Sequence, residues 1–286
     1  MVFTTNGGFK LRNFKTETFE EAVAYDKHSD HQYNCGLLLI KGLGIKQGST
    51  VLDIGAGTGR LALHVAGLIG RNGLYFGIDI SPERINIAKK KAEGLQDSNL
   101  FFEVGDGTDL SRFEDGFFDV VYMNSVFHWI KDKKILLHEC FRVLKPGGHL
   151  GFTSHVKNLP RNNVREIAGT ILKKRGYNKR GYNISVPQHD NYPVTVDEAR
   201  RLLEQTGFPV QNIEVRQTTD NFASAEDAVN SIMNRDPHQN FLRDVPKKQH
   251  PEIGNELITE LKKIETEEGI HFVRNKIYAI AEKGGK

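Results

Sequence analysis

Cysteines are scarce in this sequence, and long apolar runs are missing. Only two cysteines, Cys35 and Cys140, occur among the 286 residues, and their spacing matches no metal site. A disulfide framework is therefore not expected, no metal is predicted, and a reducing, cytoplasmic setting is the default. The longest apolar runs, such as residues 37–40, are far too short to cross a bilayer. The polar first residues do not resemble a signal peptide, so no membrane partner is expected.

Charges of the two signs are nearly balanced. A formal net charge of +3 is too small to indicate nucleic-acid binding by itself. Hydrophobic residues make up 38% and charged residues 26% of the chain, as in soluble globular proteins. No internal repeat occurs, and the length predicts one large domain or a domain with a cap.

Alternating glycines follow a short apolar stretch, residues 51–54, which we predict to be a buried strand. Gly55, Gly57 and Gly59 then lead into a helix expected to start near Thr58. A Cβ at these glycines would block close approach of a ligand to the backbone or force a strained φ. The unpaired N–H groups at the start of the helix would point at whatever lies over the turn. The stretch therefore indicates a nucleotide-type pocket at the carboxyl end of a strand.

Strands and helices alternate from this turn onward. Apolar stretches predict five strands, at residues 51–54, 74–78, 100–104, 118–123 and 149–153. The segment Lys-Pro-Gly-Gly at residues 145–148 is predicted to be a turn before the fifth strand. Crossover helices between these strands imply a parallel sheet with helices on both faces. Residues 213–219 and 272–281 are predicted to form two further strands.

Capping signals place three of the helices. Thr18 with Glu21 and Thr195 with Glu198 match the capping box, and Ser81 is a good N-cap. Residues 221–268 are also expected to be helical, with an apolar stripe made of Leu257, Ile258, Leu261 and Ile264.

The glycine turn departs from the dinucleotide-binding fingerprint at one position. That fingerprint is G-x-G-x-x-G, and Arg60 occupies the place of its third glycine. Asp53 lies two residues before the first glycine. With these features, the turn resembles motif I of the class I methyltransferases that use S-adenosylmethionine.

The resemblance continues in order along the chain. Asp79 and Asp106 close the second and third predicted strands, and residues 118–121 and 144–148 match the motifs around the fourth and fifth. The stretch His128-Trp129-Ile130 is similar to the small-molecule group called methyltransferase type 11, which includes trans-aconitate methyltransferases. One such motif is weak, but five in the right order are strong.

The resemblance implies an α/β fold with a Rossmann-like, seven-stranded, mostly parallel sheet. Helices should cover both faces, with a terminal antiparallel strand and helical cap insertions. The implied domains are an N-terminal helical lid at 1–44, a cofactor-binding core at 45–155, cap insertions at 156–212 and 221–268, and terminal strands at 213–220 and 269–286.

The resemblance also implies S-adenosylmethionine as cofactor and S-adenosylhomocysteine as product. Asp79 would accept hydrogen bonds from both ribose hydroxyls, because one carboxylate can accept from two adjacent O–H groups. Asp106 would contact the adenine amino group, and Tyr25 would belong to the lid. The full implied set is Asp53, Gly55, Ala56, Gly57, Thr58, Gly59, Asp79, Ile80, Asp106, Gly107, Asn124 and Tyr25.

Three residues are candidates on the acceptor side of the site. His128 follows the fourth predicted strand and could act as a general base, since histidine titrates near neutral pH. Its alternative role is to pack beside the cofactor with local hydrogen bonds. Trp129 could stack on substrate or fill the core. His155 ends the fifth strand, where it could contact substrate or have a structural role.

The first functional hypothesis is in-line methyl transfer to an O, N or other nucleophile of a small, possibly anionic, molecule. The basic segment 157–180 is the main source of alternatives, because it could be a solvated surface, attract an anionic small molecule or contact RNA phosphates. An RNA or protein methyltransferase docking through this segment is therefore the second hypothesis, although nucleic acid is not favoured. Arg60 argues against a nicotinamide dehydrogenase, the two cysteines argue against an arsenic-methylating branch, and a non-catalytic binding module stays open. Oligomeric state cannot be read from the sequence.

Overall fold

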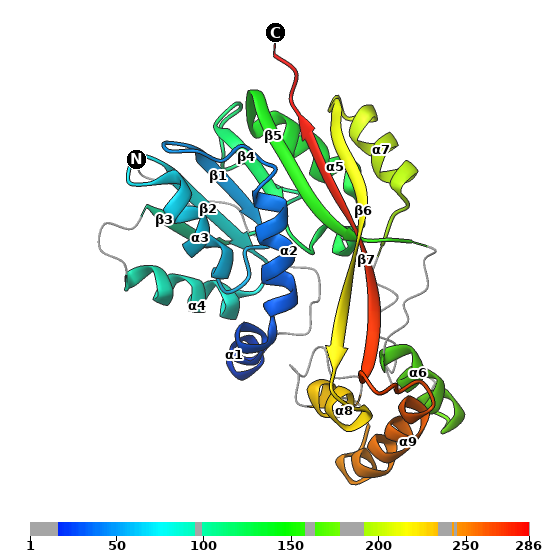
Figure 1. Cartoon of the computed structure of the whole chain (residues 1–286). Helices are drawn as coiled ribbons and strands as arrows, with labels where there is room; N and C mark the ends of the chain where they lie inside the picture. Colours follow the sequence, from blue (N-terminus) through cyan, green and yellow to red (C-terminus); the bar gives the residue numbers. More distant parts are fainter. Residues whose placement is uncertain are drawn as a thin grey trace.

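The computed structural model describes residues 17–94, 99–157, 164–177, 192–233, 242 and 245–285. Within them, one seven-stranded sheet has the order β3-β2-β1-β4-β5-β7-β6 (Figure 1). The first five strands are parallel, and β7 runs antiparallel to both of its neighbours, β5 and β6. The predicted mostly parallel sheet is thus confirmed. The strands are β1 Thr50–Ile54, β2 Leu74–Asp79, β3 Leu100–Val104, β4 Phe118–Met123, β5 Leu144–His155, β6 Val210–Phe222 and β7 Ile270–Glu282.

Helices form where the capping signals predicted them. Both capping boxes are complete, with Thr18 capping α1 and Thr195 capping α7, and Ser81 caps α4. The described helices are α1 Phe19–His28, α2 Asp30–Ile40, α3 Arg60–Ile69, α4 Pro82–Glu93, α5 Lys133–Val143, α6 Val164–Lys174, α7 Val196–Gln205, α8 Ala225–Met233 and α9 His250–Lys262, with 3-10 turns η1 Phe127–Trp129 and η3 Lys247–Gln249. No helix of the described residues is long and apolar enough to span a bilayer.

Two apolar clusters fill the two faces of the sheet. One contains buried side chains of α5 and α7, such as Leu137 and Leu203, and the other contains those of α2, α3 and α4, such as Leu39 and Val65. Burying each such side chain stabilises the fold by about 1.5–3 kcal/mol. α7 therefore packs on the core sheet, although residues 156–212 were predicted to belong to the cap. The division of the chain into domains otherwise stays a prediction.

A third cluster lies at the far end of the β6–β7 ribbon. β5 pairs with β7 only as far as His155 opposite Lys276, whereas β6 and β7 remain paired out to Phe222 opposite Ile270. Figure 1 shows the two strands continuing past the sheet to α6, α8 and α9. There Phe272 and the apolar faces of these helices form a small core of their own. Both strands are longer than predicted, because this third cluster supports them beyond the sheet.

Two local predictions are wrong. Residues 145–148 form no separating turn, because Leu144 already pairs with Phe118 and β5 continues through a register shift. Ile264 does not belong to the buried stripe, because it follows the end of α9 and is 46% exposed. α3 also begins two residues later than predicted, with Gly59 as its N-cap.

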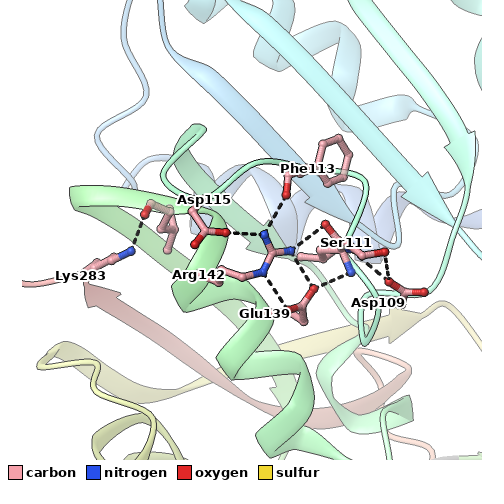
Figure 2. A network of polar contacts seen from close by, with 9 residues as sticks. Asp109, Ser111, Phe113, Asp115, Glu139, Arg142 and Lys283 are labelled. Atoms are coloured by element: carbon pink, nitrogen blue, oxygen red, sulfur yellow. Dashed lines mark hydrogen bonds and ion pairs between the residues drawn. The ribbon is translucent and has the colours of Figure 1, made fainter. Parts of the chain in front are cut away.

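A polar network holds the loop between β3 and β4 against α5 (Figure 2). Arg142 of α5 donates to the carbonyl oxygens of Leu110 and Phe113, both at 2.8 Å. Its guanidinium also pairs with Asp115 and Glu139. Glu139 in turn accepts a hydrogen bond from the backbone N–H of Leu110. Guanidinium has donors enough for all of these acceptors, so one side chain fixes the path of the loop.

Candidate cofactor and acceptor site

The turn after β1 is held in a conformation that favours glycine. Gly55, Gly57 and Gly59 have φ angles of 80°, 56° and 76°, in the left-handed region. A Cβ on Gly55 would lie 2.1 Å from a methyl carbon of Val126, so no side chain fits there. The backbone N–H groups of Gly55 and Ala56 both donate to the carbonyl oxygen of Ile78. The turn is therefore fastened to the end of β2.

Asp79 at the end of β2 is a charged partner of this turn. Its Oδ2 accepts from the N–H of Gly57, and its Oδ1 accepts from the N–H of Ser81, both at 2.9 Å. The side chain is buried, which raises the pKa of Asp79, while Arg84 acts in the opposite direction. Each carboxylate oxygen keeps a lone pair beyond these contacts, so Asp79 can accept from two further donors.

α1 lies across the same edge of the sheet. The guanidinium of Arg84 stacks on the ring of Tyr25, 3.9 Å from its centroid, and pairs with Glu17 at 2.6 Å. Glu17 also accepts from the hydroxyl of Ser81. A Cβ on Gly57 would lie 3.5 Å from the Tyr25 ring, so the lid faces the glycine turn. The sequence predicted Tyr25 here but gave no signal for Arg84 or Glu17, because only the folded chain brings them together.

Asp26 adds a second attachment between α1 and the core. It accepts from the hydroxyl of Thr58 and from the ammonium of Lys91, both at 2.5 Å. Arg60 forms an ion pair with Asp30 at the start of α2, which also belongs to the predicted lid. Thr58, predicted as a cofactor contact, is buried and holds the lid through its hydroxyl.

Asp53 lies beneath the turn, inside the sheet. Its Oδ2 accepts from the hydroxyls of Tyr75 and Tyr122, both at 2.7 Å. Burial raises the pKa of Asp53 to about 7, although the two hydroxyl groups oppose the shift. Both tyrosines look like ordinary core residues in the sequence, so their role could not be read from it.

The remaining predicted cofactor residues lie at the same edge. One oxygen of Asp106 accepts from the N–H and the hydroxyl of Thr108, both at 2.9 Å. Gly107 is buried, and Ile80 is partly exposed beside Asp79. The cofactor roles of all these residues stay predictions.

Asn124 links α2 to the ends of β4 and β5. Its amide nitrogen donates to the carbonyl oxygen of Gln32 at 2.7 Å, and its amide oxygen accepts from the hydroxyl of Thr153 at 2.9 Å. Both ends of the side chain are thus engaged within the protein. The predicted contact of Asn124 with the cofactor would have to use the second hydrogen of its amide nitrogen or the second lone pair of its amide oxygen.

The two histidines on the acceptor side are stacked. The ring centroids of His128 and His155 lie 3.8 Å apart, with 24° between the ring planes. The backbone N–H of His155 donates to Nδ1 of His128. His128 is only 1% exposed, which favours its packing role over proton abstraction, because a base must reach the proton that it removes. Trp129 is 43% exposed, so the alternative that it fills the core is wrong.

Comparison with known proteins identifies the family. The methyltransferase domain model matches residues 45–207, more than half of the chain. The chain belongs to the methyltransferase family. An arsenite methyltransferase of Aquipseudomonas alcaligenes is 37% identical to it over 131 residues, covering 44% of the chain and 37% of that protein. A demethylmenaquinone methyltransferase of Staphylococcus aureus is 29% identical over 220 residues, covering 73% of the chain and 86% of that protein.

The chain spans little more than a third of the length of the arsenite methyltransferase, so the match is confined to one part of that relative. Among solved structures, the YcgJ protein of Bacillus subtilis has a TM-score of 0.59 at 19% identity, covering 90% of the chain and all of that protein. At this identity the likeness concerns the fold, and it confirms the Rossmann-like methyltransferase architecture.

The residues at the turn fit S-adenosylmethionine, the cofactor of class I methyltransferases. Asp79 offers an acceptor on each carboxylate oxygen, which matches the adjacent hydroxyls of a ribose. The left-handed glycines leave the backbone bare of side chains beside it. The Tyr25 ring lies beside Gly57, so an aromatic surface borders the same turn.

Proposed function

We propose that this methyltransferase transfers the methyl group of S-adenosylmethionine to a nucleophile on a small-molecule acceptor. The single observation that carries the proposal is the pairing of Asp79 with the N–H of Gly57, which joins the diol-binding carboxylate to the glycine turn. The family match over residues 45–207 supports it. The named acceptors of the two relatives, arsenite and demethylmenaquinone, differ from each other and do not define the acceptor here.

We assign the following tasks to the chain. Asp79 accepts from the ribose hydroxyls, and the exposed side of Ile80 packs against the adenine. Asp106 uses its second carboxylate oxygen for the adenine amino group. The glycine turn admits the methionine part of the cofactor to the backbone, and Tyr25 covers it from the lid.

When bound, S-adenosylmethionine supplies a methyl group on a positively charged sulfonium, which is an excellent leaving group. The chain therefore has to orient the acceptor atom and exclude water, and proximity supplies most of the rate. A carboxylate acceptor needs no base. We expect His128 to position His155 and the end of β5 through their stacked rings.

The arsenite specificity of the first relative does not fit this chain. Cys35 lies in the cluster under α2, and Cys140 lies in the cluster under α5, on the opposite face of the sheet. Both thiols are buried, and burial raises the pKa of the Cys140 thiol far above its ordinary value. Thiols placed apart in this way cannot bind one arsenic atom together.

RNA or protein docking through segment 157–180 is not favoured. Among its described cations, Lys157 pairs with Glu198 and Arg175 pairs with Glu252 and Glu256, whereas Lys173 and Lys174 at the end of α6 are exposed. Tyr177 is buried in the third apolar cluster, with α6, α8 and α9, which we call the cap cluster. Tyr182 and several of the basic residues lie outside the described residues. The pairing leaves Arg175 with little charge to offer phosphate groups.

The test is methyl transfer itself. The small-molecule fraction of a cell extract is incubated with the protein and methyl-labelled S-adenosylmethionine, and labelled products are found by mass spectrometry. We expect at least one labelled product that depends on the protein and disappears with Asp79→Ala. Label incorporated only into RNA or protein would overturn the small-molecule assignment.

A further inference from the structure

The β6–β7 ribbon carries a partly buried polar band between two apolar ends. On one face of the ribbon, Phe272 enters the cap cluster and Tyr278 packs with the cluster under α2. Between them the pairing register places Thr218 opposite Arg274, and Lys276 follows two residues later on the same face. Polar side chains in such a position need an explanation, because an apolar face would continue the core at lower cost.

Lys276 is the most buried member of this band. Its side chain is 3% exposed, and its Nζ donates to the hydroxyl of Ser125 at 2.6 Å. Among the described residues, no carboxylate forms an ion pair with it. Burial lowers the pKa of Lys276 from its ordinary value. An ammonium can donate three hydrogen bonds. Ser125 and the thiol of Cys35 accept two, and Asp220 acts on the ammonium without forming an ion pair with it, so within the described residues one donor and part of the counter-charge remain unsupplied.

Two further donors of the band lack partners. Nε of Arg274 and the hydroxyl of Thr218 are buried and make no hydrogen bond within the described part of the chain. The other end of the Arg274 guanidinium pairs with Asp220, which also lies 3.7 Å from a ring nitrogen of His31. Two cations, Lys276 and Arg274, thus share one carboxylate. Buried polar groups without partners are rare and point to a missing ligand.

The band lies on the acceptor side of the sheet. Lys276 is the pairing partner of His155 at the end of β5, and it contacts Ser125 just after β4. Ser125 has a φ of 61° and is the one non-glycine residue with a left-handed backbone in the described ranges. Such strain persists where the surroundings impose it, often at ligand sites. Asn124, one residue earlier, is one of the residues predicted to contact the cofactor.

We propose that Lys276, Arg274 and Thr218 form a binding site for one oxyanion, a carboxylate or phosphate group carried by the methyl acceptor. All three offer donors, and the one carboxylate beside them, Asp220, is already paired with the far end of the Arg274 guanidinium, so they select a further group that accepts hydrogen bonds. One negative charge would balance the excess of cations over Asp220. The oxyanion serves as an anchor, and the nucleophile that receives the methyl group lies elsewhere on the same molecule. This inference rests on the proposed function.

Three probes that share one ring test the site: benzoate, phenyl phosphate and the neutral benzamide. Binding of each is measured by calorimetry with and without S-adenosylhomocysteine. We expect one anion to bind the wild type and benzamide to bind at least about tenfold more weakly, as expected when a charge-assisted bond is missing. Preference for benzoate identifies a carboxylate, and preference for phenyl phosphate identifies a phosphate.

Variants connect the binding to the band. Lys276→Met should weaken anion binding about tenfold or more, and Thr218→Val should weaken it severalfold. Lys283→Met is the matched control, because Lys283 follows the same strand and donates to the carbonyl oxygen of Leu144, far from the band. It should leave anion binding unchanged. Circular dichroism confirms that each variant is folded, and Thr218→Val still tests the site if Lys276→Met does not fold.

The failures of the two proposals are distinguishable. If the wild type binds S-adenosylhomocysteine but neither anion better than benzamide, the oxyanion site is wrong and the proposed function stands. Equal anion binding by the wild type, Lys276→Met and Thr218→Val would also overturn the site. If S-adenosylhomocysteine does not bind, the proposed function is wrong, whatever the anions do.

Discussion

The carboxylate of Asp79 accepts a hydrogen bond from the backbone N–H of Gly57 at 2.9 Å. This contact joins two segments that are 22 residues apart, the turn after β1 and the end of β2. It holds the turn open beside an anionic acceptor, and the lid residue Tyr25 lies above the same glycine. In the proposed function, this contact orients the carboxylate of Asp79 before the cofactor binds, which lowers the entropic cost of binding.

Arg84 is expected to control how firmly the lid is held. Arg84→Ala removes the stacking on Tyr25 and the ion pair with Glu17. We predict about tenfold faster amide exchange in α1, because a partly buried cation–π contact and ion pair together contribute about 1–2 kcal/mol. Hydrogen–deuterium exchange measured by mass spectrometry reads this directly.

The control for the lid is Arg175→Ala in the cap, which removes the ion pairs of an arginine with Glu252 and Glu256. It should leave exchange in α1 unchanged. If Arg84→Ala also leaves α1 as protected as in the wild type, the lid is held by Asp26 and not by Arg84.

Asp53 should make stability depend on pH. Its folded pKa is about 7, raised from 3.8 by burial, so the folded state binds a proton that the unfolded state has already lost. The contribution of Asp53 to stability is then highest below about pH 4 and falls as the pH rises towards 7, by at most about 4 kcal/mol. Asp53→Asn removes this titration and should flatten the dependence of the melting temperature on pH between 4 and 7. An equally steep dependence in the variant would show that other groups cause it.

Much of the fold could be predicted from the sequence, because its signals are local. The capping boxes at Thr18 and Thr195 and the strands at residues 100–104 and 118–123 depend on neighbours in the chain, and all formed as predicted. The extent of the β6–β7 ribbon could not be predicted, because the cap cluster that supports it assembles from distant segments.

The candidate site divides in the same way. Its glycines and the position of Asp79 follow from the strand-turn-helix pattern. The tyrosines that bind Asp53 and the cations of the polar band are ordinary strand residues in sequence. Their roles depend on which strands become neighbours, and local patterns carry no such information.

Arg142 should contribute strongly to stability through the loop after β3. Arg142→Ala leaves the carbonyl oxygens of Leu110 and Phe113 without their donor and separates Asp115 from its partner. We predict a loss of about 2–4 kcal/mol in the free energy of unfolding, since hydrogen bonds to charged groups contribute about 1.5–3 kcal/mol each and the site is partly exposed. Urea denaturation measures it. Arg142→Lys keeps the positive charge but not the planar set of guanidinium donors, so it should recover only part of the lost stability. Full recovery would show that the charge alone holds the loop.

His128 should act by position and not by proton transfer. With an acceptor identified by labelling, His128→Asn is expected to lower kcat by less than about tenfold and to leave the pH profile of kcat/KM unchanged, because general bases contribute about 100-fold or more. Steady-state kinetics across pH 6 to 9, about the range in which histidine titrates, make the distinction. Loss of an acidic limb together with a drop of about 100-fold would assign His128 as the base.

Binding of S-adenosylhomocysteine to the wild type and to Asp79→Ala, measured by isothermal titration calorimetry, tests the central claim most directly. We predict that the wild type binds one molecule per chain. Asp79→Ala should bind at least about tenfold more weakly, because it loses the acceptors for the ribose hydroxyls. Asp109→Ala, which removes an exposed carboxylate whose hydrogen bonds within the described residues come from Ser111, should bind like the wild type. No binding by the wild type, or equal binding by Asp79→Ala, would contradict the account.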